Sequence, residues 1–254
     1  MDQDITVERS GGLLVITLNR PEVRNAVDAA MSAAIAAAID ELDTDNALSV
    51  GILTGAGGTF CAGMDLKAFL RGERPEVAGR GFAGLTEAPP AKPLIAAVEG
   101  YALAGGCELV LACDLVVAAR DASFGLPEVC RGLIAGSGGL LRLPRKIPSQ
   151  IAMELALTGD PLSAVDAQRW GLVNRLVESG HALPAAVELA TRIARNGPLA
   201  VRATKRIVDE APAWPSGEVW DRQRRELDVI LASADAAEGA AAFAGRREPR
   251  WKGA

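Results

Sequence analysis

The sequence predicts an α/β fold whose first half alternates strands with helices and whose second half is mainly helical. Short apolar runs rich in β-branched residues recur along the first half, and turn-forming residues bound them. A stretch with four-residue apolar spacing separates the first two runs. After about Gly136, almost every apolar pattern has helical spacing. The order strand, helix, strand indicates an α/β core.

The strands and helices of the first half follow from these patterns. We expect strands at residues 13–18, 50–54, 93–98 and 115–118. Between the first two, Val27, Met31, Ile35 and Ile39 form one apolar stripe, so this segment is predicted to be a helix. Asn25 is the predicted N-cap of this helix, with Asp28 as an acid in its first turn. A second, apolar helix is expected from about residue 105 to 113.

The second half is predicted to hold helices at residues 151–157, 164–170, 183–194, 199–210 and 218–231, with a short strand at 172–177. The final segment, residues 240–254, mixes aromatic and basic side chains, among them Trp251 and Lys252. Such a tail is either a solvated, frayed end or a segment that docks on the body or on a neighbouring subunit.

Composition restricts the classes of function. The 254 residues, 49% hydrophobic and 23% charged, fit one folded domain with room for a helical appendage. A net charge of −5 argues against nucleic-acid binding, and any anionic ligand requires local cations. No run is long enough for membrane insertion, the first ten residues lack a secretory pattern, and the four cysteines form no CxxC pair. We therefore expect a cytoplasmic protein with reduced thiols.

Three segments carry candidate chemistry, and the first is GAGGTFCAGMD at residues 55–65. Its glycines can bring backbone N–H groups close to a ligand, although an ordinary glycine-rich turn has the same composition. It is not a dinucleotide-binding fingerprint, because the third glycine of that motif is missing.

The second segment is AGGCE at residues 104–108, where glycines open the second predicted helix. Unpaired N–H groups and the helix dipole at such a start stabilise an oxygen that gains negative charge. Glu108 lies one turn into this otherwise apolar helix. It is either a functional carboxylate or a first-turn acid that complements the dipole.

The third segment, residues 123–139, contains Glu128 directly after Pro127 and before a glycine cluster. Desolvation in a stiff apolar turn raises the pKa of a carboxylate towards neutrality, and two such carboxylates suit proton transfer at pH 7. A surface Pro-Glu turn is equally compatible with the spacing.

A hydrolase is the competing enzyme class. AGSGG at residues 135–139 differs from a nucleophile elbow at one position, and Ser137, Asp160 or Asp166, and His181 follow one another in the order that the motif requires. The strand before the serine is poor, however, and His181 lies in an apparent surface loop. As His181 is the single histidine, the sequence also argues against a zinc site, and no metal is expected.

Together, GTFCAGMDL, EGYALAGGCEL and ASFGLPEVCRGLIAGSGG resemble the crotonase, or enoyl-CoA hydratase/isomerase, superfamily. The resemblance continues through LTGDPLSAVDAQRWGLVNRLV and FAGRREPRWKG and covers nearly the whole chain. It implies a crotonase-like spiral of ββα turns over residues 1–195, followed by a helical trimerisation region over residues 196–254. It also implies a homotrimer or a dimer of trimers.

The resemblance assigns roles to residues at the motif positions. The backbone N–H groups of Met64 and Gly105 would hold the thioester oxygen of an acyl-CoA. Glu108 would activate a water molecule, Glu128 would protonate C2, and the backbone of Gly136 would line the water site. Residues that would bind the coenzyme A (CoA) moiety are Arg24, Ala26, Ala62, Asp65, Leu66, Lys67, Phe243 and Arg246. Arg246 stands where better-studied hydratases have lysine.

The implied activity is hydration of a 2-enoyl-CoA to a 3-hydroxyacyl-CoA, with no cofactor beyond the CoA of the substrate. Ala135 and Ala104 depart from the commoner proline and glycine, but neither change removes a catalytic group. SGGLLRLPRKIP and RWGLVNR are similar to the carnitinyl-CoA dehydratase branch, which makes that activity the alternative. An isomerase, which typically works with one acid, and a non-catalytic acyl-CoA-binding protein are the remaining alternatives.

Overall fold

The computed structural model describes residues 4–253 and contains one six-stranded sheet with the strand order β1-β2-β3-β6-β8-β11. β1 pairs antiparallel with β2, and every later pair in this sheet is parallel. The strands are β1 (Ile5–Ser10), β2 (Leu13–Leu18), β3 (Val50–Gly55), β6 (Leu94–Val98), β8 (Leu115–Ala119) and β11 (Arg175–Val177). The four strands predicted in the first half are thus confirmed.

A second, three-stranded sheet runs beside the first and has the order β10-β9-β7. It consists of β7 (Tyr101–Leu103), β9 (Ser123–Gly125) and β10 (Leu162–Ser163). β6 and β8 of the large sheet are each followed directly by a strand of the small sheet and then by helical segments. This repetition confirms the predicted spiral of ββα turns. A small hairpin, β4 (Glu76–Val77) with β5 (Gly81–Phe82), lies apart from both sheets.

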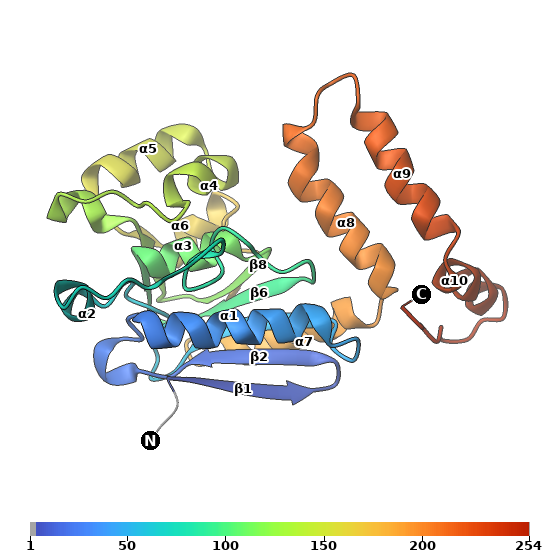
Figure 1. The fold of residues 1–254 in the computed structure, drawn as a ribbon, viewed down its shortest axis with the longest axis horizontal. Coiled ribbons are helices and arrows are strands. Elements are labelled where there is room, and N and C mark those ends of the chain that lie inside the picture. The colour runs from blue at the N-terminus through green and yellow to red at the C-terminus, as the bar shows by residue number, and fades with distance from the viewer. Residues whose placement is uncertain (1–3, 254) are drawn as a thin grey trace.

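Helices cover both faces of the large sheet (Figure 1). On one face α7 (Ala182–Ala194) places Ala182, Ala186 and Ala190 against the strands, and these small side chains allow the helix to lie close. On the other face lie α1 (Ala29–Thr44) and α3 (Gly105–Ala112). The other helical segments are η1 (Pro21–Val23), α2 (Leu66–Leu70), η2 (Pro127–Arg131), α4 (Gly139–Lys146), α5 (Ser149–Thr158), α6 (Ala164–Arg169), α8 (Pro198–Glu210), η3 (Ala211–Ala213), α9 (Val219–Leu231) and α10 (Ala234–Ala244).

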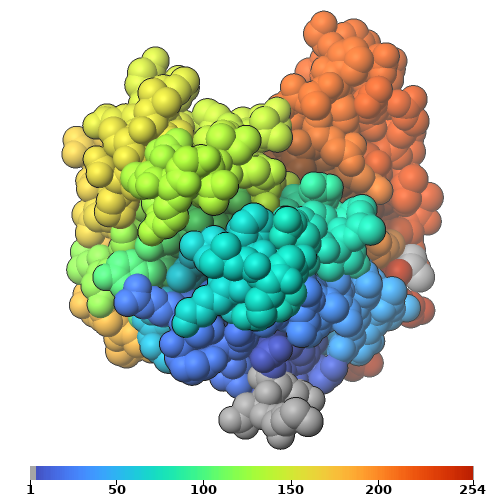
Figure 2. All heavy atoms as spheres, turned by 60° about the vertical axis from the view of Figure 1, so that its left-hand side comes forward, coloured from blue at the N-terminus to red at the C-terminus, as the bar shows by residue number. Residues whose placement is uncertain are grey.

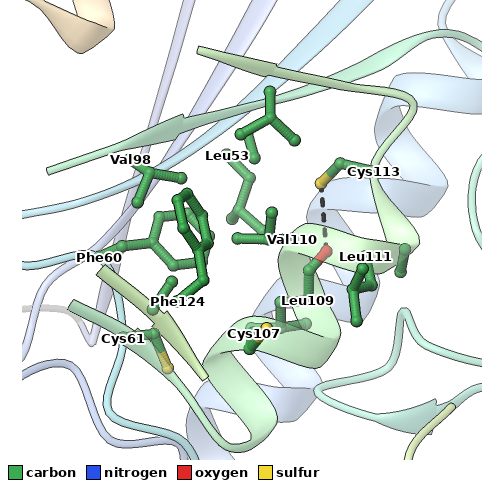
Figure 3. Packing of buried hydrophobic residues seen from close by; sticks show 14 of the residues in the cluster. Leu53, Phe60, Cys61, Val98, Cys107, Leu109, Val110, Leu111, Cys113 and Phe124 are labelled. Carbon is green, nitrogen blue, oxygen red and sulfur yellow. Dashed lines mark hydrogen bonds between the residues drawn. The ribbon is translucent and has the colours of Figure 1, made fainter. Parts of the chain in front are cut away.

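Helix α3 is buried over its full length, and this burial positions the site. Figure 3 shows Val110 of α3 beside the rings of Phe60 and Phe124, while Cys113 closes the helix by donating to the carbonyl of Leu109 (3.3 Å). Its apolar residues follow one another without the polar face of a surface helix. A polar side chain on this helix therefore requires partners inside the protein.

The predicted start of α1 is wrong in detail. Asp28, not Asn25, is the N-cap, because its carboxylate accepts the N–H of Met31 (2.9 Å). Asn25 is fully buried with a φ of 55°, and its amide donates to the carbonyls of Thr59 (2.7 Å) and Ala56 (3.0 Å). It holds a loop and does not begin the helix.

The carboxyl-terminal helices form a hairpin of α8 and α9 that rises beside α4 and α5 (Figure 1). The surface is hollowed between the yellow-green and orange segments in Figure 2. Lys205 of α8 ties the hairpin to the body, since its ammonium donates to Asp114 (2.8 Å) and to the carbonyls of Pro90 (2.7 Å) and Lys92 (3.1 Å). The division between residues 195 and 196 stays a prediction.

As far as Gly253, the tail docks on its own chain, so within the described residues it is not the solvated, frayed end that the sequence also allowed. The indole N–H of Trp251 donates to the carbonyl of Arg195 (2.8 Å). The buried Asp235 accepts the N–H groups of Lys252 (2.7 Å) and Gly253 (3.0 Å). Within residues 4–253, no helix is both long and apolar enough to cross a membrane.

The Lys205–Asp114 pair predicts a stability difference. Replacing Lys205 with Met leaves a largely buried carboxylate without its cation, so we expect the free energy of unfolding to fall by about 3 kcal/mol in urea titrations. Arg206→Met breaks a more exposed pair with Glu226 and is the matched control, with an expected loss below about 1 kcal/mol. Equal losses in the two variants would contradict this account.

Candidate active site

A cleft of about 450 Å³ opens at the beginning of α3. It is lined by polar and apolar residues drawn from segments that are far apart in the sequence. The residues predicted for the site that line it are Arg24, Ala62, Met64, Leu66, Gly105, Glu108, Glu128 and Gly136. The fold thus brings together all five predicted catalytic positions.

The N–H group of Met64 is directed by a short parallel bridge to Val27. Val27 donates to the carbonyl of Gly63 (2.8 Å) and accepts the N–H of Asp65 (2.9 Å). Because alternate N–H groups of an extended segment point to opposite sides, the N–H of Met64 faces away from Val27. On that side a methyl group built on Gly63 would lie 3.0 Å from the nitrogen of Gly105, so the segment packs against the beginning of α3.

The N–H group of Gly105 is exposed to the cleft by a sharp turn from β7 into α3. Ala104 makes this turn with φ 51° and ψ −126°, a backbone conformation that residues other than glycine rarely adopt. It donates its own N–H to the carbonyl of Gly125 (2.9 Å). The first N–H groups of a helix have no intrahelical acceptor. Gly106 has no room for a side chain, since a methyl group there would lie 2.2 Å from the carbonyl oxygen of Cys61. Met64 and Gly105 therefore both line the cleft, at the point where the Gly63 segment packs against the beginning of α3.

Glu108 is a buried carboxylate with defined partners. It is 3% exposed, and its Oε1 accepts the N–H groups of Ser137 (2.7 Å) and Gly139 (2.8 Å) at the beginning of α4. Burial raises the pKa of Glu108, while these hydrogen bonds and the charge of Arg142 oppose the rise. Gly139 leaves little room for a side chain, because a methyl group would lie 3.1 Å from that carboxylate.

Glu128 lies in η2, which Pro127 begins, and differs from Glu108 in its surroundings. Its Oε2 is buried and has no hydrogen-bond partner among the described residues. Desolvation, together with the nearby charge of Glu108, raises the pKa of Glu128 to about 6. A group with that pKa can hold or release a proton near neutral pH.

The remaining predicted CoA-binding residues do not line the cleft of this chain. Asp65 caps α2 through the N–H groups of Lys67 (3.0 Å) and Ala68 (3.1 Å) and pairs with Arg20 (3.1 Å). Burial opposes ionisation of Asp65, but the donors of Ala68 and Arg20 outweigh it and lower its pKa. Ala26 uses its carbonyl to accept from Arg20 (2.8 Å).

Lys67 is exposed on α2, next to the cleft-lining Leu66. Phe243 of α10 is 89% exposed, and Arg246 follows it with a φ of 50°. Neither of these two tail residues contributes to the cleft within the described chain.

The hydrolase arrangement is not assembled. Ser137 lines the cleft, but His181 is exposed at the beginning of α7, with its Nδ1 3.2 Å from the carbonyl of Ser179. Asp166 instead accepts from Ser163 (2.7 Å) at the cap of α6. Among residues 4–253, no group of three or more His, Cys, Asp or Glu side chains is placed to hold a metal ion.

Sequence reasoning missed one wall of the cleft. Phe69, Phe82, Leu133 and Ile134 supply apolar surface, and Glu76, Glu87 and Arg131 supply charge. The exposed Leu133-Ile134 pair was the detectable signal, because two large apolar residues in a loop often mark a binding surface. Phe69, Glu76, Phe82 and Glu87 come from the segment 69–87, whose position the sequence pattern does not determine, and Arg131 ends η2.

A spiral of ββα turns with two carboxylates in one cleft at the beginning of a buried helix is the arrangement of a crotonase-type enzyme. The sequence matches the family described as enoyl-CoA hydratase/isomerase over residues 8–254, and the chain belongs to this family.

Three similar proteins illustrate the relationship. The solved structure of an enoyl-CoA hydratase from Mycobacterium tuberculosis H37Rv is 60% identical, with a TM-score of 0.98 and full coverage of both chains. A carnitinyl-CoA dehydratase from Salmonella enteritidis PT4 is 44% identical over 100% of both chains. The structure of a carnitinyl-CoA hydratase from Mycobacterium avium is 47% identical, with a TM-score of 0.80 and full coverage of both chains.

The raised pKa of Glu128 predicts a pH-dependent stability. The folded protein holds this proton up to about pH 6, whereas the unfolded chain releases it near the ordinary value of 4.5. Unfolding therefore releases a proton between these values, and the free energy of unfolding falls as the pH rises across the window. Chemical denaturation of wild type and Glu128→Gln between pH 4.5 and 6 measures the difference. Parallel curves for the two proteins would show that the pKa is not raised.

Proposed function

We propose that the protein is a hydro-lyase that adds water reversibly across the 2,3 double bond of a 2-enoyl-CoA to give a 3-hydroxyacyl-CoA. The observation that carries this proposal is the pair of glutamates. Glu108 and Glu128 share one cleft, act electrostatically on each other and have different hydrogen-bonding environments. Hydration needs a nucleophile and a proton at adjacent carbons, and two such carboxylates meet this need.

The thioester oxygen is proposed to bind between the N–H groups of Met64 and Gly105. As water attacks C3, the electrons of the double bond move towards this oxygen, which gains negative charge. Two fixed donors and the positive end of the α3 dipole favour that charge in a site partly closed to solvent. The electrons then return and C2 takes a proton.

Glu108 is proposed to act as the base towards water and Glu128 as the acid towards C2. Two N–H donors and Arg142 favour the ionised form of Glu108. Glu128 has a raised pKa and so retains a proton more readily. Gly136 leaves space for the water, since a methyl group built on it would find only the carbonyl of Ile134, at 3.9 Å. The roles of the two glutamates reverse in dehydration.

The CoA moiety is proposed to lie along Arg24, Ala62 and Leu66 at the mouth of the cleft, with Ala26, Asp65 and Lys67 beside them. Phe243 and Arg246 are proposed to reach CoA across a subunit contact in a homotrimer or dimer of trimers. The reaction then needs no cofactor other than the CoA of its substrate. We propose a cytoplasmic location for it.

Loss of crotonyl-CoA absorbance on hydration tests the activity. Glu108→Gln and Glu128→Gln are each expected to lower kcat at least about 100-fold, because each removes a proton-transfer group, while CoA binding measured by calorimetry persists. Glu188→Gln, on the exposed face of α7, is the control with unchanged kcat. If the wild type bound CoA but hydrated no enoyl-CoA of any chain length, it would be a non-catalytic acyl-CoA-binding protein. Double-bond migration without hydration would indicate an isomerase.

A second candidate, carnitinyl-CoA dehydratase, catalyses the same class of reaction on a substrate with a trimethylammonium group. The cleft-lining carboxylates Glu76 and Glu87 and the aromatic ring of Phe82 favour it, whereas Arg74 already stacks on the ring of Phe69. Carboxylates and aromatic faces both attract a quaternary ammonium ion. The similarity to carnitinyl-CoA dehydratases adds support.

The two candidates differ in their response to Glu87→Gln. If the acyl end is cationic, this variant is expected to lower kcat/KM for crotonobetainyl-CoA about 5-fold, because roughly 1 kcal/mol of attraction is lost at a partly exposed site. Its kcat/KM for the neutral crotonyl-CoA serves as the internal control and stays within twofold. Equal changes for both substrates would exclude Glu87 as a recognition group for the cation.

A further inference from the structure

Behind the cleft-lining Ser137 lies a half-buried cation that the proposed chemistry does not use, Arg142 of α4. Its Nη2 donates to the carbonyl of Thr86 (2.5 Å), in the loop that precedes the cleft-lining Glu87. Its backbone N–H donates to the carbonyl of Gly138 (2.9 Å). One residue therefore links the loop at Thr86 to the beginning of α4.

The guanidinium lies directly against the turn that holds Glu108. Gly138 has a φ of 100°, and a methyl group built on it would lie 2.1 Å from Nη1 and 3.3 Å from Cζ of Arg142. Gly138 is flanked by Ser137 and Gly139, whose N–H groups both donate to Oε1 of Glu108. Displacing the guanidinium would therefore loosen the turn that orients the carboxylate.

The charges around Glu108 come from three elements. Glu128 faces it from η2 and acts as a like charge, and Arg142 acts from α4 as an opposite charge. On α3 itself, burial raises the pKa of Cys107 to about 12, so that thiol is neutral near pH 7. Arg142 in turn is influenced by Arg145 and by Asp209 of α8. The hydrogen bonds from Gly139 and Ser137 oppose the desolvation of Glu108 most strongly, and Arg142 adds a positive charge to them.

We propose that Arg142 is a positioning residue for hydration: it clamps the Ser137–Gly139 turn against Thr86 and supplies the positive charge that keeps Glu108 ready to accept a proton. This inference rests on the proposed function, with Glu108 as the base. This role of Arg142 differs from a role in substrate binding, because Arg142 acts through Glu108 and the turn. Its loss should reduce kcat more than it changes KM.

The test compares Arg142→Met, Arg142→Lys and the control Arg145→Met on crotonyl-CoA across pH. Arg145→Met removes the same charge from the exposed side of the same helix. For Arg142→Met we expect kcat to fall about 10- to 100-fold with KM within threefold, because a misplaced catalytic group loses rate rather than affinity. The acid limb of its kcat profile should move upward, since Glu108 loses a cation that favours its ionised form.

Arg142→Lys keeps the charge but not the planar fork, so its acid limb should stay near that of wild type while kcat recovers only in part. Arg145→Met should match wild type in kcat and in the position of the acid limb. If Arg142→Met does not fold, the lysine variant decides alone, and a full recovery of kcat or a shifted limb would overturn the proposal. For a folded Arg142→Met, an unmoved limb overturns it, whatever happens to kcat.

A readout without turnover separates this inference from the proposed function. Infrared titration of the Glu108 carboxyl, identified as the band lost in Glu108→Gln, gives its pKa in the free protein. We expect a higher pKa in Arg142→Met and an unchanged one in Arg145→Met. An unchanged pKa in Arg142→Met overturns the role of Arg142 even if wild type hydrates crotonyl-CoA. If the wild type were inactive but the pKa of Glu108 still rose in Arg142→Met, the result would instead count against the proposed function.

Discussion

The structure of the site depends on one constraint: a carboxylate on a completely buried helix must find hydrogen-bond donors. Glu108 finds them in the N–H groups of Ser137 and Gly139, so the beginning of α4 is held against α3. An unpaired buried charge would destabilise the fold by several kcal/mol, and the paired one joins two segments about thirty residues apart. The same contacts bring Gly136 to the cleft, while α3 itself presents the N–H of Gly105. Satisfying one buried side chain thus assembles much of the site.

Two residues of the same type acquire different properties from their surroundings. Glu108 is almost inaccessible but has two backbone donors, whereas Glu128 is less buried but has a carboxylate oxygen without a partner. Their pKa values are both raised by burial, and the missing donors leave Glu128 near 6. Environments that separate an acid from a base allow a single pair of glutamates to move a proton in either direction. Arg142 illustrates the same principle, because its charge behind the turn opposes the rise in the pKa of Glu108.

Local pattern predicted the regular elements and failed where long-range contacts decide. The strands of the large sheet and the helices α1, α3 and α7 follow from apolar spacing, which reflects burial on defined faces. Asn25 was misassigned because a capping side chain and a buried loop residue have the same composition, and only the carbonyls of Ala56 and Thr59 distinguish them. The strand β1 was missed because it lies at an edge and is largely exposed. The tail was left open because the docking of Trp251 on Arg195 joins residues 56 positions apart.

The sequence by itself determined the fold class, the helix that carries Glu108 and, through three ordered motifs, the positions of the candidate catalytic groups. Those features are local, since glycines, a proline and apolar spacing define them over short segments. Only the tertiary structure decided that Glu108 and Glu128 share a cleft, that Ser137 belongs to it without His181, and that Glu76 and Glu87 line its wall. It also decided that Asp65 serves its own helix and Arg20. Charges and donors act through space, so their effects depend on neighbours that the order of residues does not reveal.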